Sequence, residues 1–93
     1  MQKSIHSADY QHFLAELRAQ RERLGLSQEQ LAAALGEHQT LVSKVERGVR
    51  RLDIIELRNW LAAMNVRLSD FIATLEGRLS RHTLPLGRQK RTR

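Results

Sequence analysis

The stretch that decides the fold is SQEQLAAALGEHQTLVSKVERG, residues 27–48. Ser27 is a favourable N-cap, a glutamine three residues later completes a capping box, and Gly36 ends the short helix that follows. A second short helix begins near Gln39 and ends at the final glycine of the stretch. Helices of this length are marginal alone, so both must pack on neighbouring helices. Because Ala32 is small enough to let the two helices cross closely, the stretch predicts a tight helix-turn-helix unit.

The spacing of apolar residues and the capping residues predict three further helices around this unit. Apolar residues recur at three- and four-residue steps over residues 9–24, and Gly25 ends that helix. Asp53 caps a fourth helix, Ser69 caps a fifth, and Gly77 ends the fifth. The residues expected to face inward on these three helices are Tyr10, Phe13, Leu14, Leu17, Arg21, Leu24, Ile54, Leu57, Leu61, Met64, Phe71, Ile72, Leu75 and Leu79. No β-type alternation occurs, so we predict an all-α fold of five helices.

The composition limits the domain organisation and the cellular setting. A chain of 93 residues has room for one domain, which we place at 9–82, between a flexible N-terminus at 1–8 and a basic, disordered tail at 83–93. The absence of cysteine excludes disulfides and thiolate-metal sites. No apolar run approaches the length of a membrane span, and the N-terminus lacks the apolar stretch of a signal peptide. We therefore expect a cytoplasmic, nucleoid-associated protein without a membrane partner.

The charge distribution points to a polyanionic partner. The formal net charge is +6, and the six basic residues from Arg78 onward have no acidic residue among them. A second basic cluster surrounds the single acidic residue Glu46 and comprises Lys44, Arg47, Arg50 and Arg51. We expect Arg50 and Arg51 to contact phosphates beside a DNA groove. Arg47 is open to two interpretations, a phosphate contact or a favourable charge at the end of its helix.

One strip of side chains on the second short helix has the chemistry to read base edges. It consists of Gln39, Thr40, Ser43 and Lys44, which we call the reading strip. Gln can bind adenine through two hydrogen bonds, Lys can donate to guanine, and Ser or Thr can contact a base or a phosphate. Val42 and Val45 lie on the opposite side of the helix, which turns the strip outward. The sequence thus predicts sequence-specific binding to the major groove of double-stranded DNA.

Residues 10–76 resemble the lambda-repressor-like helix-turn-helix family, the Cro and phage-repressor type also called XRE, most specifically in LSQEQLAAALG and VSKVERG. The resemblance implies that Gln28 binds a phosphate and supports Gln39, the first residue of the recognition helix. It also implies base or nearby phosphate contacts for the rest of the reading strip, and backbone contacts for Arg47, Arg50 and Arg51. Two residues depart from the family pattern. His38 stands where the family often has a Ser or Thr cap, and Leu41 is apolar on a face that is often polar.

The resemblance further implies a homodimer that regulates transcription, most simply as a repressor. It assigns the dimer surface to the fifth helix, where Phe71, Leu75 and Leu79 could leave apolar area exposed. Two recognition helices about 34 Å apart, one turn of DNA, would read an inverted-repeat operator.

Three alternatives account for the sequence less well. An antitoxin would use the same DNA-binding core and add a toxin partner, although the basic tail has no amphipathic pattern for wrapping another protein. An ordinary helical bundle would not explain why the small-residue crossing, the glycine turn and the basic loop coincide. An enzyme is rejected, because the sequence offers no catalytic grouping. The four histidines have no ligand spacing, so neither a metal nor another cofactor is expected.

Overall fold

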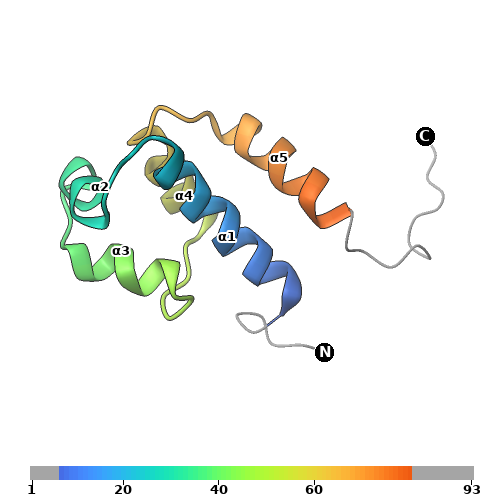
Figure 1. The fold of residues 1–93 in the computed structure, drawn as a ribbon, viewed down its shortest axis with the longest axis horizontal. Helices are drawn as coiled ribbons and strands as arrows, with labels where there is room; N and C mark the ends of the chain where they lie inside the picture. The colour runs from blue at the N-terminus through green and yellow to red at the C-terminus, as the bar shows by residue number, and fades with distance from the viewer. Residues whose placement is uncertain (1–6, 81–93) are drawn as a thin grey trace.

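The computed structural model describes residues 7–80, which form five α-helices and contain no strand. The helices are α1 (Ala8–Arg23), α2 (Gln28–Leu35), α3 (Gln39–Glu46), α4 (Ile54–Ala62) and α5 (Leu68–Ser80). α2 and α3 pack against each other on one side of α1, and α5 lies on its other side (Figure 1). The predicted all-α, five-helix fold is confirmed.

The starts of α2 and α4 and the end of α2 are set by local chemistry that the sequence predicts. The Ser27 hydroxyl accepts a hydrogen bond from the backbone N–H of Gln30 at 3.0 Å, and the Gln30 side chain accepts one from the Ser27 N–H at 2.8 Å. Asp53 and Glu56 make the same reciprocal pair at the start of α4. Gly36 ends α2 with a φ of +71°, a conformation that glycine adopts without steric penalty. These two capping boxes fix where α2 and α4 begin.

Other helix boundaries differ from the sequence expectation. Ser7 caps α1 through a hydrogen bond from the Tyr10 N–H, so residues 7 and 8, which we assigned to a flexible N-terminal segment at 1–8, belong to the start of this helix. α5 begins at Leu68, before Ser69, and continues through Gly77, so the predicted cap and the predicted end were both wrong. Gly77 does not have the positive φ of a glycine that ends a helix, so α5 continues through it. An added Cβ at Gly77 would meet no atom within 4 Å. Residues 1–6, Arg81, His82 and the tail at 83–93 lie outside the described residues.

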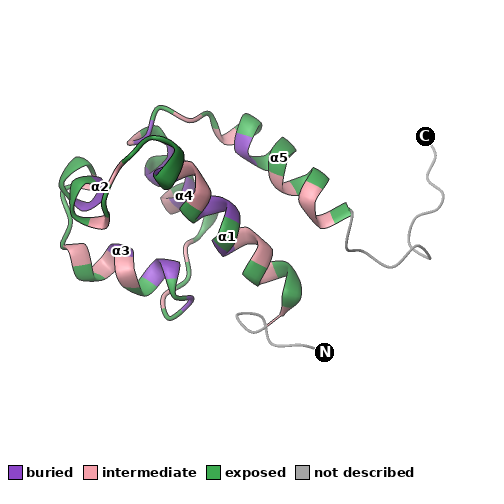
Figure 2. Cartoon of the chain, in the orientation of Figure 1, coloured by how far each residue is buried: buried purple, intermediate pink, exposed green. Residues whose placement is uncertain are grey.

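The core is apolar and receives residues from all five helices (Figure 2). Its buried members are Leu17, Leu31, Ala32, Val42, Val45, Leu57, Trp60, Leu61, Met64 and Phe71. Ala32 is 2% exposed, as the close crossing of α2 and α3 requires. Three residues assigned to the inner face are exposed instead, namely Leu24, Ile54 and Ile72. Ile72 follows the completely buried Phe71 and so lies about 100° around α5 from the buried side. Leu24 follows the last turn of α1 and Ile54 is the first residue of α4, and at helix ends the helical period no longer determines burial.

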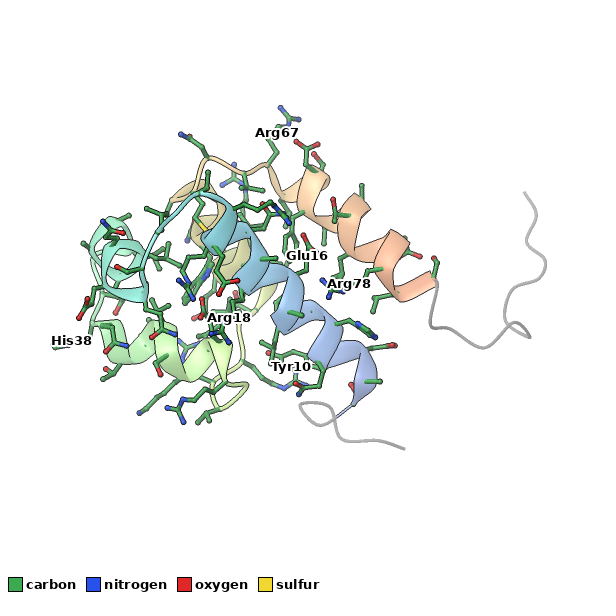
Figure 3. The ribbon with its side chains drawn as sticks, in the orientation of Figure 1. Tyr10, Glu16, Arg18, His38, Arg67 and Arg78 are labelled. Carbon is green, nitrogen blue, oxygen red and sulfur yellow. The ribbon has the colours of Figure 1, made fainter. Side chains whose placement is uncertain are left out.

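A buried carboxylate ties α5 to α1. Glu16 is 5% exposed and accepts hydrogen bonds from Arg78 at 2.9 Å, from Arg23 at 2.9 Å and from Gln20 at 3.0 Å. The Arg78 side chain points from α5 toward Glu16 on α1 in Figure 3. Arg78, which the sequence grouped with the basic tail, is therefore neutralised within the fold.

Candidate nucleic-acid interface

α3 presents the reading strip to solvent. Thr40 and Lys44 are exposed, and Gln39 and Ser43 are partly exposed. With 3.6 residues per turn, these four positions share one side of the helix. Val42 and Val45, on the other side, are completely buried and hold α3 against the core. The expected orientation of the strip is confirmed.

The two residues that depart from the family pattern have clear surroundings. Leu41 is half-buried and packs against the hydrophobic core, beside Leu35 and Trp60 at the edge of α2 and α4. It therefore extends the buried side of α3. His38 precedes α3 in an extended conformation but makes no side-chain cap hydrogen bond, and it lies at the exposed turn between α2 and α3 (Figure 3).

The end of α3 is closed tightly, which places the basic loop. Gly48 has a φ of +80°, and its N–H donates to the carbonyl of Val45 at 3.0 Å. The N–H groups of Val49 and Arg50 both donate to the carbonyl of Lys44, at 2.8 and 3.2 Å. This arrangement is the Schellman motif, which reverses the chain immediately after the helix. The loop that follows is therefore held against the end of α3.

A chain of hydrogen bonds runs from the core to the first residue of the reading strip. Arg21 on α1 donates to both carboxylate oxygens of Glu46 on α3, at 2.6 and 2.9 Å. The Gln28 Nε2 on α2 donates to Glu46 Oε1 at 3.0 Å. Gln39 Nε2 in turn donates to Gln28 Oε1 at 2.7 Å. The support of Gln39 by Gln28 that the resemblance implied is present in the structure.

The buried end of this series of hydrogen bonds is the ion pair between Arg21 and Glu46. The side chain of Arg21 is 8% exposed and that of Glu46 is 2% exposed. Arg21 also donates to the carbonyl of Leu26 at 2.7 Å, which joins the end of α1 to the start of α2. The hydrogen bond to Glu46 raises the pKa of Arg21, against the opposing effect of burial. The ion pair thus fastens α1, α3 and the α1–α2 loop together.

The three arginines of the basic cluster have different partners. Arg47 is exposed, and its Nε donates to the Ser43 hydroxyl at 3.2 Å, so it lies along the reading strip. Arg50 instead donates to both oxygens of Glu56, at 2.9 and 3.3 Å, and to the carbonyl of Arg51 at 2.6 Å. The hydrogen bond to Glu56 and the charge of that carboxylate raise the pKa of Arg50. The side chain of Arg50 is therefore held at the start of α4 by Glu56, although its backbone N–H bonds to Lys44 in the reading strip.

Arg51 lies against an aromatic ring at the start of α1. Its guanidinium carbon is 4.4 Å from the centroid of the Tyr10 ring, a distance at which the ring face attracts a cation. Burial raises the pKa of Tyr10, and the charge of Arg51 partly opposes that rise. The arginine side chain itself is exposed. Tyr10 thus orients the Arg51 side chain, which remains exposed to solvent.

Sequence reasoning missed the roles of Arg21, Glu46 and Tyr10. The spacing placed Arg21 on the inner stripe of α1, and Glu46 follows the buried Val45 on α3. Two opposite charges at inward positions were the available signal, since buried charges are nearly always paired. The stacking of Arg51 on Tyr10 joins residues far apart in the chain, and no local pattern indicates it.

Among residues 7–80, no group of three or more His, Cys, Asp or Glu side chains is placed to hold a metal ion. Within the same residues, each helix is too short or too polar to cross a membrane.

Residues 17–71 match the helix-turn-helix family. Among solved structures, the chain is similar to an XRE-family-like protein from Pseudomonas syringae pv. tomato str. DC3000, with 38% identity over 80% of this chain and 90% of that one, and a TM-score of 0.73. It is also similar to a tyrosine-to-phenylalanine mutant of the restriction-modification controller protein C.Esp1396I, with 25% identity over 83% of this chain and 98% of that one, and a TM-score of 0.74. No curated protein matches the sequence.

Proposed function

The chain belongs to the XRE-type helix-turn-helix family of DNA-binding transcriptional regulators, and from this we propose that it is a homodimeric repressor that binds an inverted-repeat operator. The proposed site of action is double-stranded DNA of the nucleoid, in the cytoplasm. α3 is the recognition helix, and the reading strip faces the bases in the major groove. The observation that carries the proposal is the outward position of this strip, with two fully buried valines holding its back to the core.

Each member of the proposed interface has a distinct task. Gln39 binds an adenine edge and Lys44 a guanine edge, while Thr40 and Ser43 contact bases or nearby phosphates. The proposed backbone contacts are made by Gln28, Arg47, Arg50 and Arg51. Arg50 reaches a phosphate only by leaving the carboxylate that it contacts in the free protein. The exposed guanidinium of Arg51 is therefore the sharper test of backbone contact.

A selection from a random pool of double-stranded DNA tests the proposal directly. The wild-type chain should select an inverted repeat. Gln39→Ala and Lys44→Ala should each weaken binding to that operator by roughly 1–3 kcal/mol and relax the preference at one base pair per half-site. Selected sequences without two-fold symmetry would contradict the dimeric arrangement, and no selection at all would contradict operator binding.

A matched pair of arginine variants separates phosphate contact from general charge. Arg51→Ala should weaken binding to all sequences alike and lower the slope of log affinity against log salt by about one. Arg67→Ala removes the same charge from an exposed position just before α5, on the side of the molecule away from α3 (Figure 3). It should leave the slope nearly unchanged. Equal effects of the two variants would show that α3 and its loop do not form the interface.

The proposed dimer surface needs one correction to the expectation from sequence. Phe71 is completely buried in the core and leaves no apolar area for a partner. Ile72, the next residue on α5, is 40% exposed, and Ile54 at the start of α4 is 56% exposed. Ile54 and Leu75 line a hollow of about 400 Å³ between α1, α4 and α5. We propose that a second copy covers this side of α5, away from α3.

The oligomeric state tests this surface. Ile72→Glu should convert the dimer to a monomer in sedimentation and weaken operator binding, since it places a charge in an apolar contact. Leu24→Glu is the matched control, because Leu24 is 51% exposed at the other end of α1. If the Ile72→Glu variant is still a dimer, the subunit interface does not include this side of α5. The toxin partner stays a prediction, which a small toxin gene beside this one would favour.

A further inference from the structure

The hydrogen-bond chain from Arg21 to Gln39 has a fixed direction. A guanidinium can only donate, and a carboxylate can only accept, whereas a glutamine amide can do either at its two ends. Glu46 accepts from Arg21 at both of its oxygens. The side chain of Gln28 must therefore direct its NH₂ group toward Glu46, which leaves its oxygen to face Gln39. Gln39 can bond to that oxygen only by donating.

This direction determines what Gln39 offers to a base. One hydrogen of its Nε2 is used by Gln28, at 2.7 Å. The second hydrogen and the carbonyl oxygen of Gln39 stay available. One donor and one acceptor side by side are what adenine requires, since its edge presents the N7 acceptor next to the N6 donor. If the amide were turned over, its donor and acceptor would exchange places and face the wrong atoms.

The burial of the ion pair makes the direction stable. An amide at the surface turns over readily, because water can donate to either end or accept from it. Here the carboxylate that sets the direction is 2% exposed, and the guanidinium bound to it is 8% exposed. In such surroundings an unsatisfied donor or acceptor is strongly unfavourable.

We propose that Glu46, which lies beneath the interface, is a specificity-determining positioning residue: through Gln28 it fixes the orientation of the Gln39 amide and so the base that Gln39 selects. The inference rests on the proposed function, in which Gln39 reads a base. It assigns to a buried acid a role in recognition as well as in stability.

Two substitutions at Glu46 separate polarity from packing. Glu46→Gln keeps the size of the side chain but lets it donate as well as accept, so both orientations of Gln28 become possible. Glu46→Asp shortens the side chain but remains an acceptor only. We expect Glu46→Gln to reduce the preference at the Gln39 base pair from roughly 5- to 150-fold to about twofold or less, while Glu46→Asp retains most of it.

The preference at the Lys44 base pair is the internal control, because no hydrogen bond joins the Lys44 side chain to this network. A general loosening of α3 would lower the preference at both base pairs. The proposal is overturned if Glu46→Gln keeps the Gln39 preference, if it lowers both preferences equally, or if Glu46→Asp loses as much as Glu46→Gln. A wild-type chain that selects no sequence would instead refute the proposed function, and the inference with it.

A measurement on the wild-type protein covers the case in which Glu46→Gln does not fold. By NMR, the side-chain NH₂ protons of Gln28 and Gln39 should exchange with water several times more slowly than those of Gln30. Gln30 uses its side-chain oxygen in the capping box, and the residue is exposed. Equal exchange rates for the three amides would show that Gln28 and Gln39 are not held, and would overturn the proposal.

Discussion

Removal of the buried cation Arg21 should bring the domain close to unfolding. Arg21→Met keeps a long side chain but takes away both hydrogen bonds that Arg21 gives to Glu46 and the one that it gives to the carbonyl of Leu26. A buried carboxylate is left with the Gln28 amide as its one side-chain donor among the described residues. Breaking a buried ion pair from one side costs about 3–5 kcal/mol. A domain of this size has a total stability of roughly 5–14 kcal/mol, so the loss is a large fraction of it.

The double variant Arg21→Met/Glu46→Leu gives the contrast. With both charges gone, no desolvated ion remains, and apolar replacements of a buried pair are often neutral or even stabilising. We therefore expect the double variant to recover most of the stability that the single variant loses. It should nevertheless bind its operator less selectively, because Gln28 no longer has a carboxylate to orient it.

Urea denaturation measures both effects. The single tryptophan, Trp60, is 3% exposed in the core and reports its opening by fluorescence, while far-UV circular dichroism reports the helices. Coincident transitions with unchanged m-values justify comparing the free energies of unfolding. A loss below about 1 kcal/mol in Arg21→Met, or a double variant no more stable than the single one, would refute the importance that we give to the ion pair.

Two further predictions concern a pair of glycines and one surface carboxylate. Gly36→Ala should lower the free energy of unfolding by about 1–2 kcal/mol, because a residue with a Cβ is strained at a φ of +71°. The added Cβ meets no atom within 4 Å, so no steric clash adds to this loss. Gly48→Ala should lower it further, since φ is +80° and the Cβ would lie 3.0 Å from the Leu14 side chain; equal losses in urea denaturation would contradict this contact. The hydrogen bond from Arg50 holds the pKa of Glu56 below its ordinary 4.5, so its ionised form stabilises the fold above that pH, and the contribution is lost as the pH falls below 4.5. Glu56→Gln should therefore lose less stability than the wild type in thermal unfolding at acid pH, and parallel losses would contradict the assignment.

The sequence predicted the parts of the fold that depend on neighbouring residues. The capping boxes that begin with Ser27 and Asp53 and the left-handed glycine at Gly36 lie where expected, because each needs only three or four residues to form. The apolar period failed at Ile54, the first residue of its helix, and at Ile72 within α5, both of which are exposed. Glycine failed as a stop signal at Gly77, which lies within α5 rather than after it.

The sequence predicted which side chains of the candidate site face solvent, but not which residues the charged side chains contact. The outward direction of Lys44 follows from the helical period and the buried valines of α3. The partners of Arg50 and Glu46 do not follow from any local pattern. Glu46 meets Arg21 across 25 positions of sequence, and that contact depends on how α1 crosses α3. Spacing alone could suggest that these charges need partners, but not which ones.

The place of α1 between α3 and α5 has a consequence for how such a regulator could change its target. If α5 carries the partner subunit and α3 enters the DNA, the separation of the two operator halves depends on α1, which packs against both of these helices. Arg21 of α1 is bonded to Glu46 on α3, and Glu16 of α1 is bonded to Arg78 on α5. These two contacts set the distance between α3 and α5. Changes in the packing of α1 would then alter the gap between half-sites while each half-site kept its base sequence.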